Sequence, residues 1–306
     1  MTKENLLVYS LATNYPESED TTFPIKFVHA VNKEFAKMGI MVKAIAPHAK
    51  GASTAYTMNS VLVRRFRYLP EGMQFNYSSI PDEIRKSKLG YFKMVLMTVS
   101  FFFFTFFQCL KQKPDIIHSH WSFPTGVIAH KMSKFFKIKY IITIHGGELP
   151  FLKKFSFIRN SAVRALNDSE IVCANSTYSK NELLKLGVKE NKIIILNVPP
   201  NFVAHSSDHE FLQEFRKKFA EPSTKIILFC GRIVERKGVE YLIRAIKEIK
   251  NQNIHLIIVG GGDLVDSLKE LTSSLELKNN ITFFGRASDK ELGQLHDISD
   301  VFVALR

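Results

Sequence analysis

The stretch that decides the fold is residues 226–238, IILFCGRIVERKG. A short apolar run ends at Gly231 and Arg232, and Lys237 and Gly238 follow shortly after. Beyond Gly238, apolar residues recur at spacings of three and four, which predicts an amphipathic helix. The stretch therefore predicts a strand, a tight cationic loop and a helix. Such a loop binds phosphate, because the free amides and the dipole at a helix start both favour an anion. The alternative is that Arg232 and Lys237 are ordinary surface charges.

Length and composition predict a two-domain globular protein. The chain has 306 residues, of which 45% are hydrophobic and 23% charged. Its three cysteines, Cys109, Cys173 and Cys230, lie far apart, so we expect buried thiols in a reducing cytoplasm and no disulfide framework. The first ten residues, MTKENLLVYS, lack the apolar core of a signal peptide and run directly into a predicted strand.

The positive charge is concentrated in the first part of the chain. The net charge is +13, and residues 1–200 hold 27 Lys and Arg residues against 14 acidic ones, whereas residues 201–306 hold 15 of each. A basic surface attracts nucleic acid or anionic lipids. The sequence shows no nucleic-acid-binding signature. We therefore expect no nucleic-acid partner and an anionic membrane surface as the candidate partner, with the protein in the cytoplasm or peripheral on the inner face of the membrane.

The opening of the chain predicts a parallel, doubly wound α/β sheet. Strand-like runs at residues 6–10 and 41–46 flank an amphipathic helix at residues 27–38. Residues 50–90 are basic and without clear periodicity, so we expect an irregular segment there, either a solvated edge or an acceptor-binding surface.

Residues 94–110 form an uncharged run with six phenylalanines. At 17 residues the run falls just short of the ~18–20 that a membrane span requires. A packed crossover helix fits its place before the next strand; a helix lying in the membrane interface and a membrane span are the alternatives.

Polar side chains follow three successive strands of the predicted first domain. His118 and His120 end the first strand, His145 to Glu148 follow the second, and Ser176 follows the third. The carboxyl ends of parallel strands meet at one edge of a sheet, where ligands bind. Two histidines at this spacing could suggest a metal site, but no Cys, Asp or Glu is suitably placed, and we expect no metal. The alternative for His145 is a structural role in capping a turn.

These motifs, together with Gly260-Gly261-Gly262 after the strand at 254–259, resemble family 4 glycosyltransferases of the GT-B fold. The resemblance extends over almost the whole chain and its motifs occur in the same order. It implies an α/β, GT-B-like fold with two Rossmann-like, doubly wound domains facing a cleft. Residues 1–198 correspond to the acceptor-side domain and residues 199–306 to the nucleotide-sugar-binding domain, which is incomplete.

The resemblance also implies roles for single residues. Arg232 and Lys237 correspond to the cations that hold the donor diphosphate, and His145 and Glu148 lie at the catalytic centre. The other implied donor-binding residues are Gly231, Gly260 and Gly261, and the implied acceptor or cleft residues are His118, His120, Gly146, Gly147 and Ser176.

The implied reaction moves a sugar, with retention of configuration, from a nucleotide-diphosphate donor to a saccharide or lipid-linked acceptor. The resemblance places such a reaction in the synthesis of a cell-surface polysaccharide or glycolipid. It implies no cofactor and no metal.

The sequence departs from the family pattern in three places. Thr21-Thr22-Phe23 replaces a Gly-Gly pair near the donor phosphate, Pro199-Pro200-Asn201 lacks the following Gly, and the sequence ends at Arg306 before the family's Glu-x7-Glu segment. We therefore expect a truncated glycosyltransferase with little activity. The alternative is a non-catalytic GT-B-like protein that binds acceptor or a partner transferase at the membrane. A nicotinamide-dependent sugar-phosphate epimerase is disfavoured, because no G-x-G-x-x-G follows the first strand.

Overall fold

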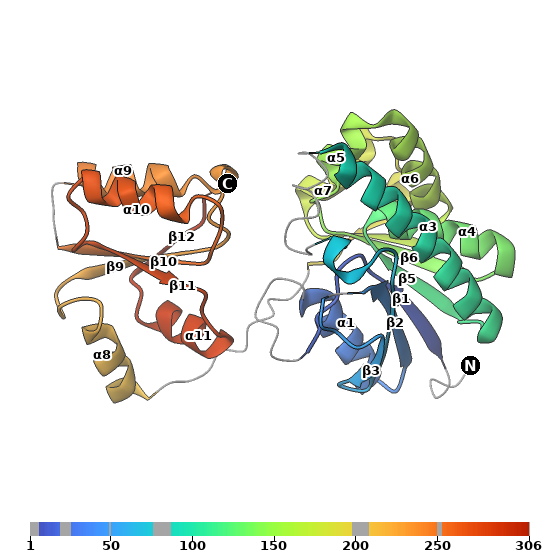
Figure 1. Ribbon diagram of the computed structural model, residues 1–306, viewed down its shortest axis with the longest axis horizontal. Coiled ribbons are helices and arrows are strands. Elements are labelled where there is room, and N and C mark those ends of the chain that lie inside the picture. The colour runs from blue at the N-terminus through green and yellow to red at the C-terminus, as the bar shows by residue number, and fades with distance from the viewer. Residues whose placement is uncertain are drawn as a thin grey trace. The chain divides into compact units, whose positions relative to one another are not determined.

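The structure is a computed structural model that describes residues 6–18, 26–48, 50–75, 87–197, 208–249 and 253–305. It divides into two compact units, Met1–Asn201 and Phe202–Arg306, each built on a central sheet with helices on both faces (Figure 1). The domain boundary predicted at residues 198–199, and the departures at residues 21–23 and 199–201, lie outside the described residues.

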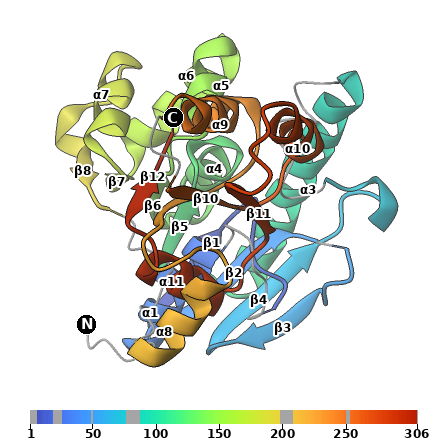
Figure 2. The same ribbon diagram turned by 90° about the vertical axis from the view of Figure 1, so that its left-hand side faces the viewer.

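The first unit contains an eight-stranded sheet in the order β3-β4-β2-β1-β5-β6-β7-β8, which Figure 2 shows edge to edge. All pairs are parallel except β3 with β4. The order reverses direction between β1 and β5, which is where open α/β sheets bind ligands. The strands are β1 (Leu7–Leu11), β2 (Met41–Pro47), β3 (Ala55–Met58), β4 (Val61–Phe66), β5 (Ile116–His120), β6 (Lys139–Ile144), β7 (Ile171–Ala174) and β8 (Ile193–Ile195).

Two hydrophobic cores, one on each face of this sheet, explain the alternation along its strands. Ile45 of β2 lies in the core beneath α3, whereas Ala44 and Ala46 lie in the core beneath α1. The predicted doubly wound fold of this unit is therefore confirmed. The α-helices of the described residues in this unit are α1 (Lys26–Lys37), α3 (Lys88–Lys111), α4 (Val127–Phe136), α5 (Leu149–Lys154), α6 (Ser156–Asp168) and α7 (Thr177–Lys185).

The prediction of an irregular segment at residues 50–90 was wrong for its first part, which forms the β3–β4 hairpin. Arg65 of β4 is buried, and its guanidinium donates to the carbonyl oxygens of Pro47, Tyr15 and Pro16 at 2.8–2.9 Å. A buried cation with this many acceptors fixes the loop after β1 to strand β4. Three arginines within residues 64–67 concealed the strand, because one of them, Arg65, points inward.

The predicted crossover helix within residues 94–110 is confirmed, and α3 is longer than predicted at 24 residues. Ser87 caps its start by accepting a hydrogen bond from the Gly90 amide. Only one side of α3 belongs to the core: Met97, Phe101 and Cys109 on that side are at most 2% exposed.

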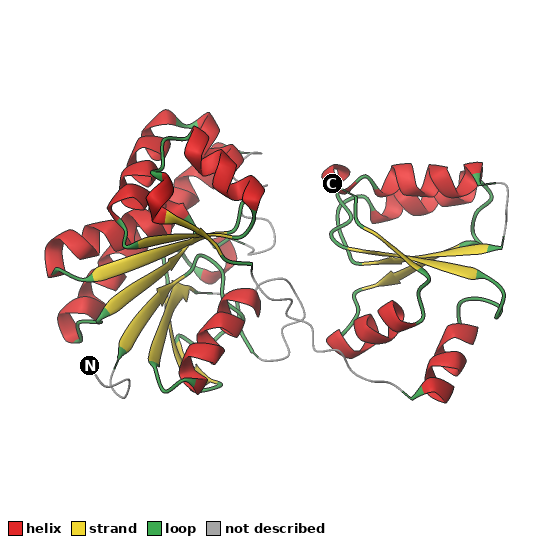
Figure 3. Ribbon diagram, turned by 180° about the vertical axis from the view of Figure 1, so that it is seen from behind, coloured by secondary structure: helices red, strands yellow, loops and turns green. Residues whose placement is uncertain are grey.

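The second unit contains a four-stranded sheet in the order β11-β10-β9-β12, with every pair parallel. Helices cover both of its faces (Figure 3). The four strands predicted here are confirmed as β9 (Lys225–Cys230), β10 (Ile254–Val259), β11 (Ile281–Gly285) and β12 (Val301–Val303), and the α-helices of its described residues are α8 (His209–Lys217), α9 (Val239–Glu248), α10 (Val265–Ser274) and α11 (Asp289–Asp297).

Candidate functional site

The three histidines predicted to lie at the carboxyl edge of the first sheet form one cluster. The ring centroids of His118 and His120 are 4.3 Å apart, and those of His120 and His145 are 5.4 Å apart. Nδ1 of His120 lies 3.2 Å from Nε2 of His145, and Nε2 of His118 lies 2.8 Å from Oγ1 of Thr143. The cluster follows from the parallel pairing of β5 with β6, which sets His118 and His120 beside the chain that leads to His145.

Burial keeps these imidazoles uncharged. It lowers the pKa of His118 to about 4 and that of His145 to about 3, and it lowers the pKa of His120 well below its usual value. Desolvation penalises the charged form of each ring, and the neighbouring rings would repel a second charge. At neutral pH the cluster therefore consists of neutral donors and acceptors of hydrogen bonds.

Two aromatic rings that sequence reasoning missed as site residues enclose His145. The centroid of the Phe27 ring lies 4.5 Å from that of His145, and the Trp121 centroid lies 4.9 Å from it. Trp121 has a φ of 73°, a backbone conformation that costs a non-glycine residue free energy and that clusters at ligand-binding sites. Hydrogen bonds from its amide to the Thr143 carbonyl and from the Thr125 hydroxyl to its own carbonyl hold it there. Trp121 adjoins the histidine motif in sequence, and this adjacency was the available signal.

Glu148 is a buried carboxyl group on the turn between β6 and α5. Neither of its side-chain oxygens has a hydrogen-bond partner among the described residues. Burial raises the pKa of Glu148 to about 7, although the nearby amides of Ser122, His145 and Gly146 favour the ionised form. A carboxyl group whose pKa lies near neutrality can both donate and accept a proton, as general acid–base chemistry requires.

A polar network joins the turn after β6 to the end of β7. The Asn175 amide donates to the carbonyl oxygen of His145 at 3.1 Å, and the Ser179 hydroxyl donates to Oδ1 of Asn175 at 2.7 Å. Gly146 has a φ of 85°, and a Cβ added to it would lie 3.3 Å from Oγ of Ser179. The hydroxyl of Ser176 accepts from the Ser179 amide and thereby caps α7. Ser176, predicted as an acceptor or cleft residue, thus has a structural role as the cap of α7, and Gly147 is exposed on the turn after β6.

In the second unit, the predicted phosphate-binding loop connects β9 to α9. Arg232 and Lys237 are both half-buried on this loop. Gly238 has a φ of 59°, which lets the chain turn directly into the first residue of α9. The loop also carries Arg236 and a single acidic residue, Glu235, so it places a net positive charge at the start of a helix.

The glycine run after β10 has a packing role that sequence reasoning missed. A Cβ on Gly260 would lie 1.9 Å from the carbonyl oxygen of Gly231, and one on Gly262 would lie 2.1 Å from that of Ile233. The amide of Ile233 donates to the carbonyl oxygen of Gly261 at 2.9 Å, and the amide of Gly260 donates to that of Gly285 at 2.7 Å. The loops that follow β9, β10 and β11 are therefore in backbone contact with one another.

Two further features bear on ligand binding. Within the described ranges, no group of three or more His, Cys, Asp or Glu side chains is arranged to hold a metal ion. A pocket of about 190 Å³ lies in the first unit, with Lys26, His29, Lys33 and Asn59 among its lining residues. It includes none of the predicted site residues, so the histidine cluster and the pocket are separate features.

Comparison with known proteins shows which relatives are similar in sequence. The chain is 26% identical over 170 residues to the putative teichuronic acid biosynthesis glycosyltransferase TuaC of Bacillus subtilis, covering 53% of this chain and 42% of that protein. It is 25% identical over 203 residues to the alpha-monoglucosyldiacylglycerol synthase of Streptococcus pneumoniae, covering 62% of this chain and 46% of that protein. The chain spans about half the length of the curated relatives that it matches, such as two uncharacterized glycosyltransferases of Methanocaldococcus jannaschii at 51% and 45%.

Solved structures share the fold at low sequence identity. Anabaena HepE in complex with UDP-glucose has a TM-score of 0.70 at 15% identity, covering 98% of this chain and 73% of that one. The sucrose-phosphate synthase of Thermosynechococcus elongatus has a TM-score of 0.74 at 15% identity, covering 98% and 75%. These matches confirm the predicted GT-B-like fold class.

The family assignment comes from two matches that together extend over most of the sequence. Residues 26–203 match the family described as Glycosyltransferase Family 4, and residues 211–306 match Glycosyl transferases group 1. The first match alone extends over more than half of the chain and includes the histidine cluster and Glu148. The chain belongs to glycosyltransferase family 4.

Proposed function

We propose that the protein transfers a sugar from a nucleotide-diphosphate donor to an acceptor hydroxyl, working in the cytoplasm. The observation that carries the proposal is the cationic loop of the second unit, Gly231–Gly238, at the start of α9. Its two half-buried cations and the helix dipole match the charge of a diphosphate. A structural neighbour, Anabaena HepE, was solved with UDP-glucose, which is a donor of this chemical class.

In this proposal each unit has its own task. When the bond between the sugar carbon and the diphosphate oxygen breaks, Arg232 and Lys237 neutralise the charge that develops on the leaving diphosphate. A new bond forms between the sugar carbon and the acceptor oxygen, and the acceptor loses its proton. Neutral His145 hydrogen-bonds to a sugar hydroxyl, and Glu148, with a pKa near 7, is the group suited to exchange a proton.

The acceptor in the proposal is a saccharide or a lipid-linked saccharide. The aromatic rings of Phe27 and Trp121 around His145 provide an apolar surface of the kind that packs against sugar C–H groups. The names of two relatives point in the same direction, since one belongs to teichuronic acid biosynthesis and another is a glycolipid synthase. The proposal requires no metal and no cofactor, since Arg232 and Lys237 neutralise the charge of the leaving diphosphate.

Calorimetric titration of the full chain with UDP, GDP and ADP tests the proposal. At least one of these should bind, and the double variant Arg232→Ala/Lys237→Ala should weaken binding about a hundredfold, because each charge-assisted contact contributes about tenfold or more. Arg236→Ala is the matched control: it removes an exposed cation from the same loop and should leave the affinity unchanged. Equal affinity of the double variant and the wild type would sink the phosphate-binding assignment.

Transfer itself is measured separately, by release of nucleoside diphosphate from the matching sugar nucleotide in the presence of lipid-linked acceptors. Nucleotide binding accompanied by sugar transfer supports the proposed enzymatic function. Binding without transfer, under conditions where a homologue is active, favours the non-catalytic alternative.

A further inference from the structure

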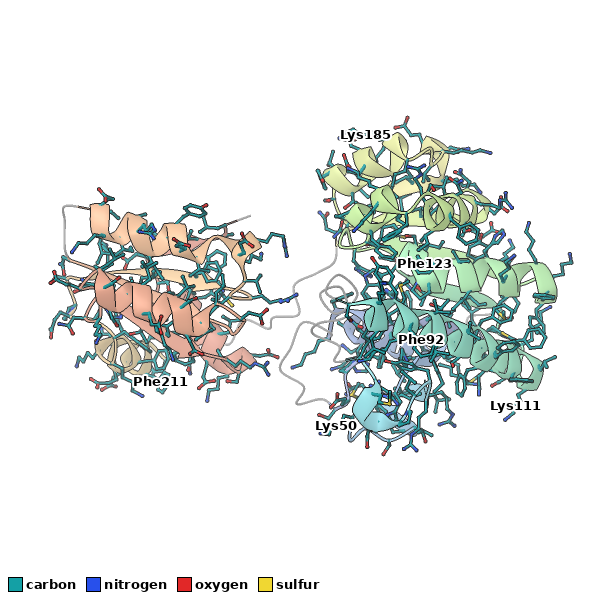
Figure 4. The ribbon with its side chains drawn as sticks, turned by 45° about the horizontal axis from the view of Figure 1, so that its top comes forward. Lys50, Phe92, Lys111, Phe123, Lys185 and Phe211 are labelled. Atoms are coloured by element: carbon teal, nitrogen blue, oxygen red, sulfur yellow. The ribbon has the colours of Figure 1, made fainter. Side chains whose placement is uncertain are left out.

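The helix α3 is apolar on both sides, although only one side contacts the core. Its residues Gly90, Met94, Met97, Phe101, Thr105 and Cys109 are buried. On the opposite side, a continuous stripe of large apolar side chains is exposed. This stripe, called here the α3 apolar face, consists of Leu89, Phe92, Val95, Val99, Phe103, Phe107 and Leu110, each 47–59% exposed. Figure 4 labels Phe92 and Lys111 near the two ends of the helix.

The α3 helix is anchored to the sheet along its length. The Tyr9 hydroxyl lies 2.6 Å from the carbonyl oxygen of Gln112, and the Lys43 ammonium donates to Oε1 of the same residue at 3.0 Å. The Phe101 ring centroid lies 4.7 Å from that of Phe66 in β4. By length and composition, α3 is the one helix of the described residues that could cross a membrane. If α3 crossed a membrane, its buried side would have to leave this core. A helix that stays packed on the sheet can contact a membrane only through the α3 apolar face, lying along the membrane surface.

Neighbouring helices extend the exposed apolar surface. Phe135 of α4 is 64% exposed, and its ring centroid lies 5.7 Å from that of Phe106 in α3. At the start of α6, Phe157 is 82% exposed, and nearby Phe155 contacts Tyr91 of α3 at a centroid distance of 5.9 Å. The continuous stripe on α3, with further exposed aromatic side chains on the helices packed beside it, marks an interaction site.

The same three helices are strongly basic. Asp168, at the end of α6, is the single acidic residue within them. Against it stand seven cationic residues, Lys88, Lys93, Lys111, Lys131, Lys134, Arg159 and Arg164. An apolar stripe of aromatic residues with flanking cations is the pattern of helices that lie in the interface of an anionic bilayer.

We propose that the α3 apolar face docks on the surface of an anionic lipid bilayer. Its phenylalanines would lie at the boundary between the headgroups and the acyl chains, and the surrounding cations would lie at the headgroups. A second copy of the chain is the competing occupant. In a two-fold dimer the same face would meet itself, which would bring two sets of cations together without compensating acidic residues. Charge complementarity therefore selects the bilayer. The inference does not depend on the proposed transfer reaction, because bilayer binding is measured without any sugar nucleotide.

The test is flotation of the full chain with phosphatidylcholine vesicles that contain 0 or about 30% phosphatidylglycerol. Binding should appear with phosphatidylglycerol, be weak without it, and fall as salt is raised. The double variant Phe103→Ser/Phe107→Ser should weaken binding at least tenfold, since each phenylalanine contributes up to about tenfold when it enters the apolar phase. Tyr241→Ser is the control, because Tyr241 is an exposed aromatic residue of the second unit and should not affect binding.

Sedimentation of the wild type and the Phe103→Ser/Phe107→Ser variant completes the experiment, with circular dichroism to verify folding. Both positions are exposed, so the variant should fold as the wild type does. Equal vesicle binding by folded variant and wild type would overturn the proposal, as would absence of binding to anionic vesicles. A wild-type dimer that the double variant dissociates, with no vesicle binding, would overturn it in favour of a second copy.

Discussion

The imidazole rings of His120 and His145 lie nearly parallel, at an interplanar angle of 16°, with Nδ1 of one 3.2 Å from Nε2 of the other. One of the two facing nitrogens donates a proton and the other accepts it. A second proton on either ring would create a charge in a buried site. If that proton bound to the accepting nitrogen, two N–H groups would face each other. Burial of the rings, together with their closeness, therefore favours the neutral form of both and lowers their pKa values.

The first prediction is a loss of stability in mild acid. In the unfolded chain a histidine takes up its proton near pH 6.5, whereas folding lowers the pKa of His118 to about 4. Between these values the unfolded state binds more protons, so the free energy of unfolding should fall as pH drops from 6.5 to 4, by up to roughly 3 kcal/mol for His118 alone. Urea unfolding at pH 7 and pH 4.5 measures this, and His118→Gln should make the slope shallower. An NMR titration of His118 with a midpoint near 6.5 would contradict the prediction.

The second prediction has the opposite sign and concerns Glu148. Its folded-state pKa of about 7 lies above the ordinary value of 4.5, so the buried group favours folding while it is protonated. This contribution to stability is complete below pH 4.5 and is lost as pH rises through 7. The free energy of unfolding should therefore fall by roughly 3 kcal/mol over this range. The stability of Glu148→Gln relative to wild type should therefore rise between pH 4.5 and pH 8. Glu190→Gln, which removes a carboxylate paired with Lys180, serves as the control and should show no such rise. A flat difference for Glu148→Gln would mean that the carboxyl is solvated.

The third prediction separates the glycines after β10. Gly260→Ala and Gly262→Ala should each destabilise the second unit by about 3 kcal/mol or more, because the new methyl group would overlap a carbonyl oxygen of the β9 loop. Gly261→Ala should cost less than about 1 kcal/mol, since its nearest neighbour, Nε of Arg286, lies 4.0 Å from the added carbon. Denaturant unfolding of the three variants compares them directly. Equal effects at all three positions would show that the loops separate easily.

The fourth prediction concerns Arg65. Arg65→Ala should destabilise the first unit by about 3–5 kcal/mol, because it removes the buried guanidinium that donates to the carbonyl oxygens of Pro47, Tyr15 and Pro16. Arg67→Ala, two residues away and exposed, should change stability by less than about 0.5 kcal/mol. Thermal unfolding followed by circular dichroism distinguishes them. Similar melting temperatures for both variants would refute the role of the buried guanidinium.

Much of this architecture could be predicted from local sequence. The strand, loop and helix at Ile226–Gly238 were predictable because apolar runs of two different periods stand on either side of a glycine. The grouping of His118, His120 and His145 was predictable because parallel strands deliver their carboxyl ends to one edge. Both arguments use only the order of residues along the chain.

What could not be predicted depends on contacts between distant segments. Periodicity could not show the strand around Arg65, because its acceptors come from the loop after β1. The exposure of one side of α3 was hidden as well, since a helix that is apolar all round does not indicate which side meets the core. Burial of Glu148 follows from the loop after β5, which lies elsewhere in the sequence.

The backbone contacts at Gly260 and Gly262 have a consequence for how family resemblance should be weighed. These glycines are required by the distance between two stretches of main chain, whether or not a nucleotide is ever bound. A descendant that had given up chemistry would still need them in order to fold. Their presence is therefore evidence of common ancestry and of a stable fold, while evidence of a working transferase must come from measured nucleotide binding and transfer, as in the test of Arg232 and Lys237.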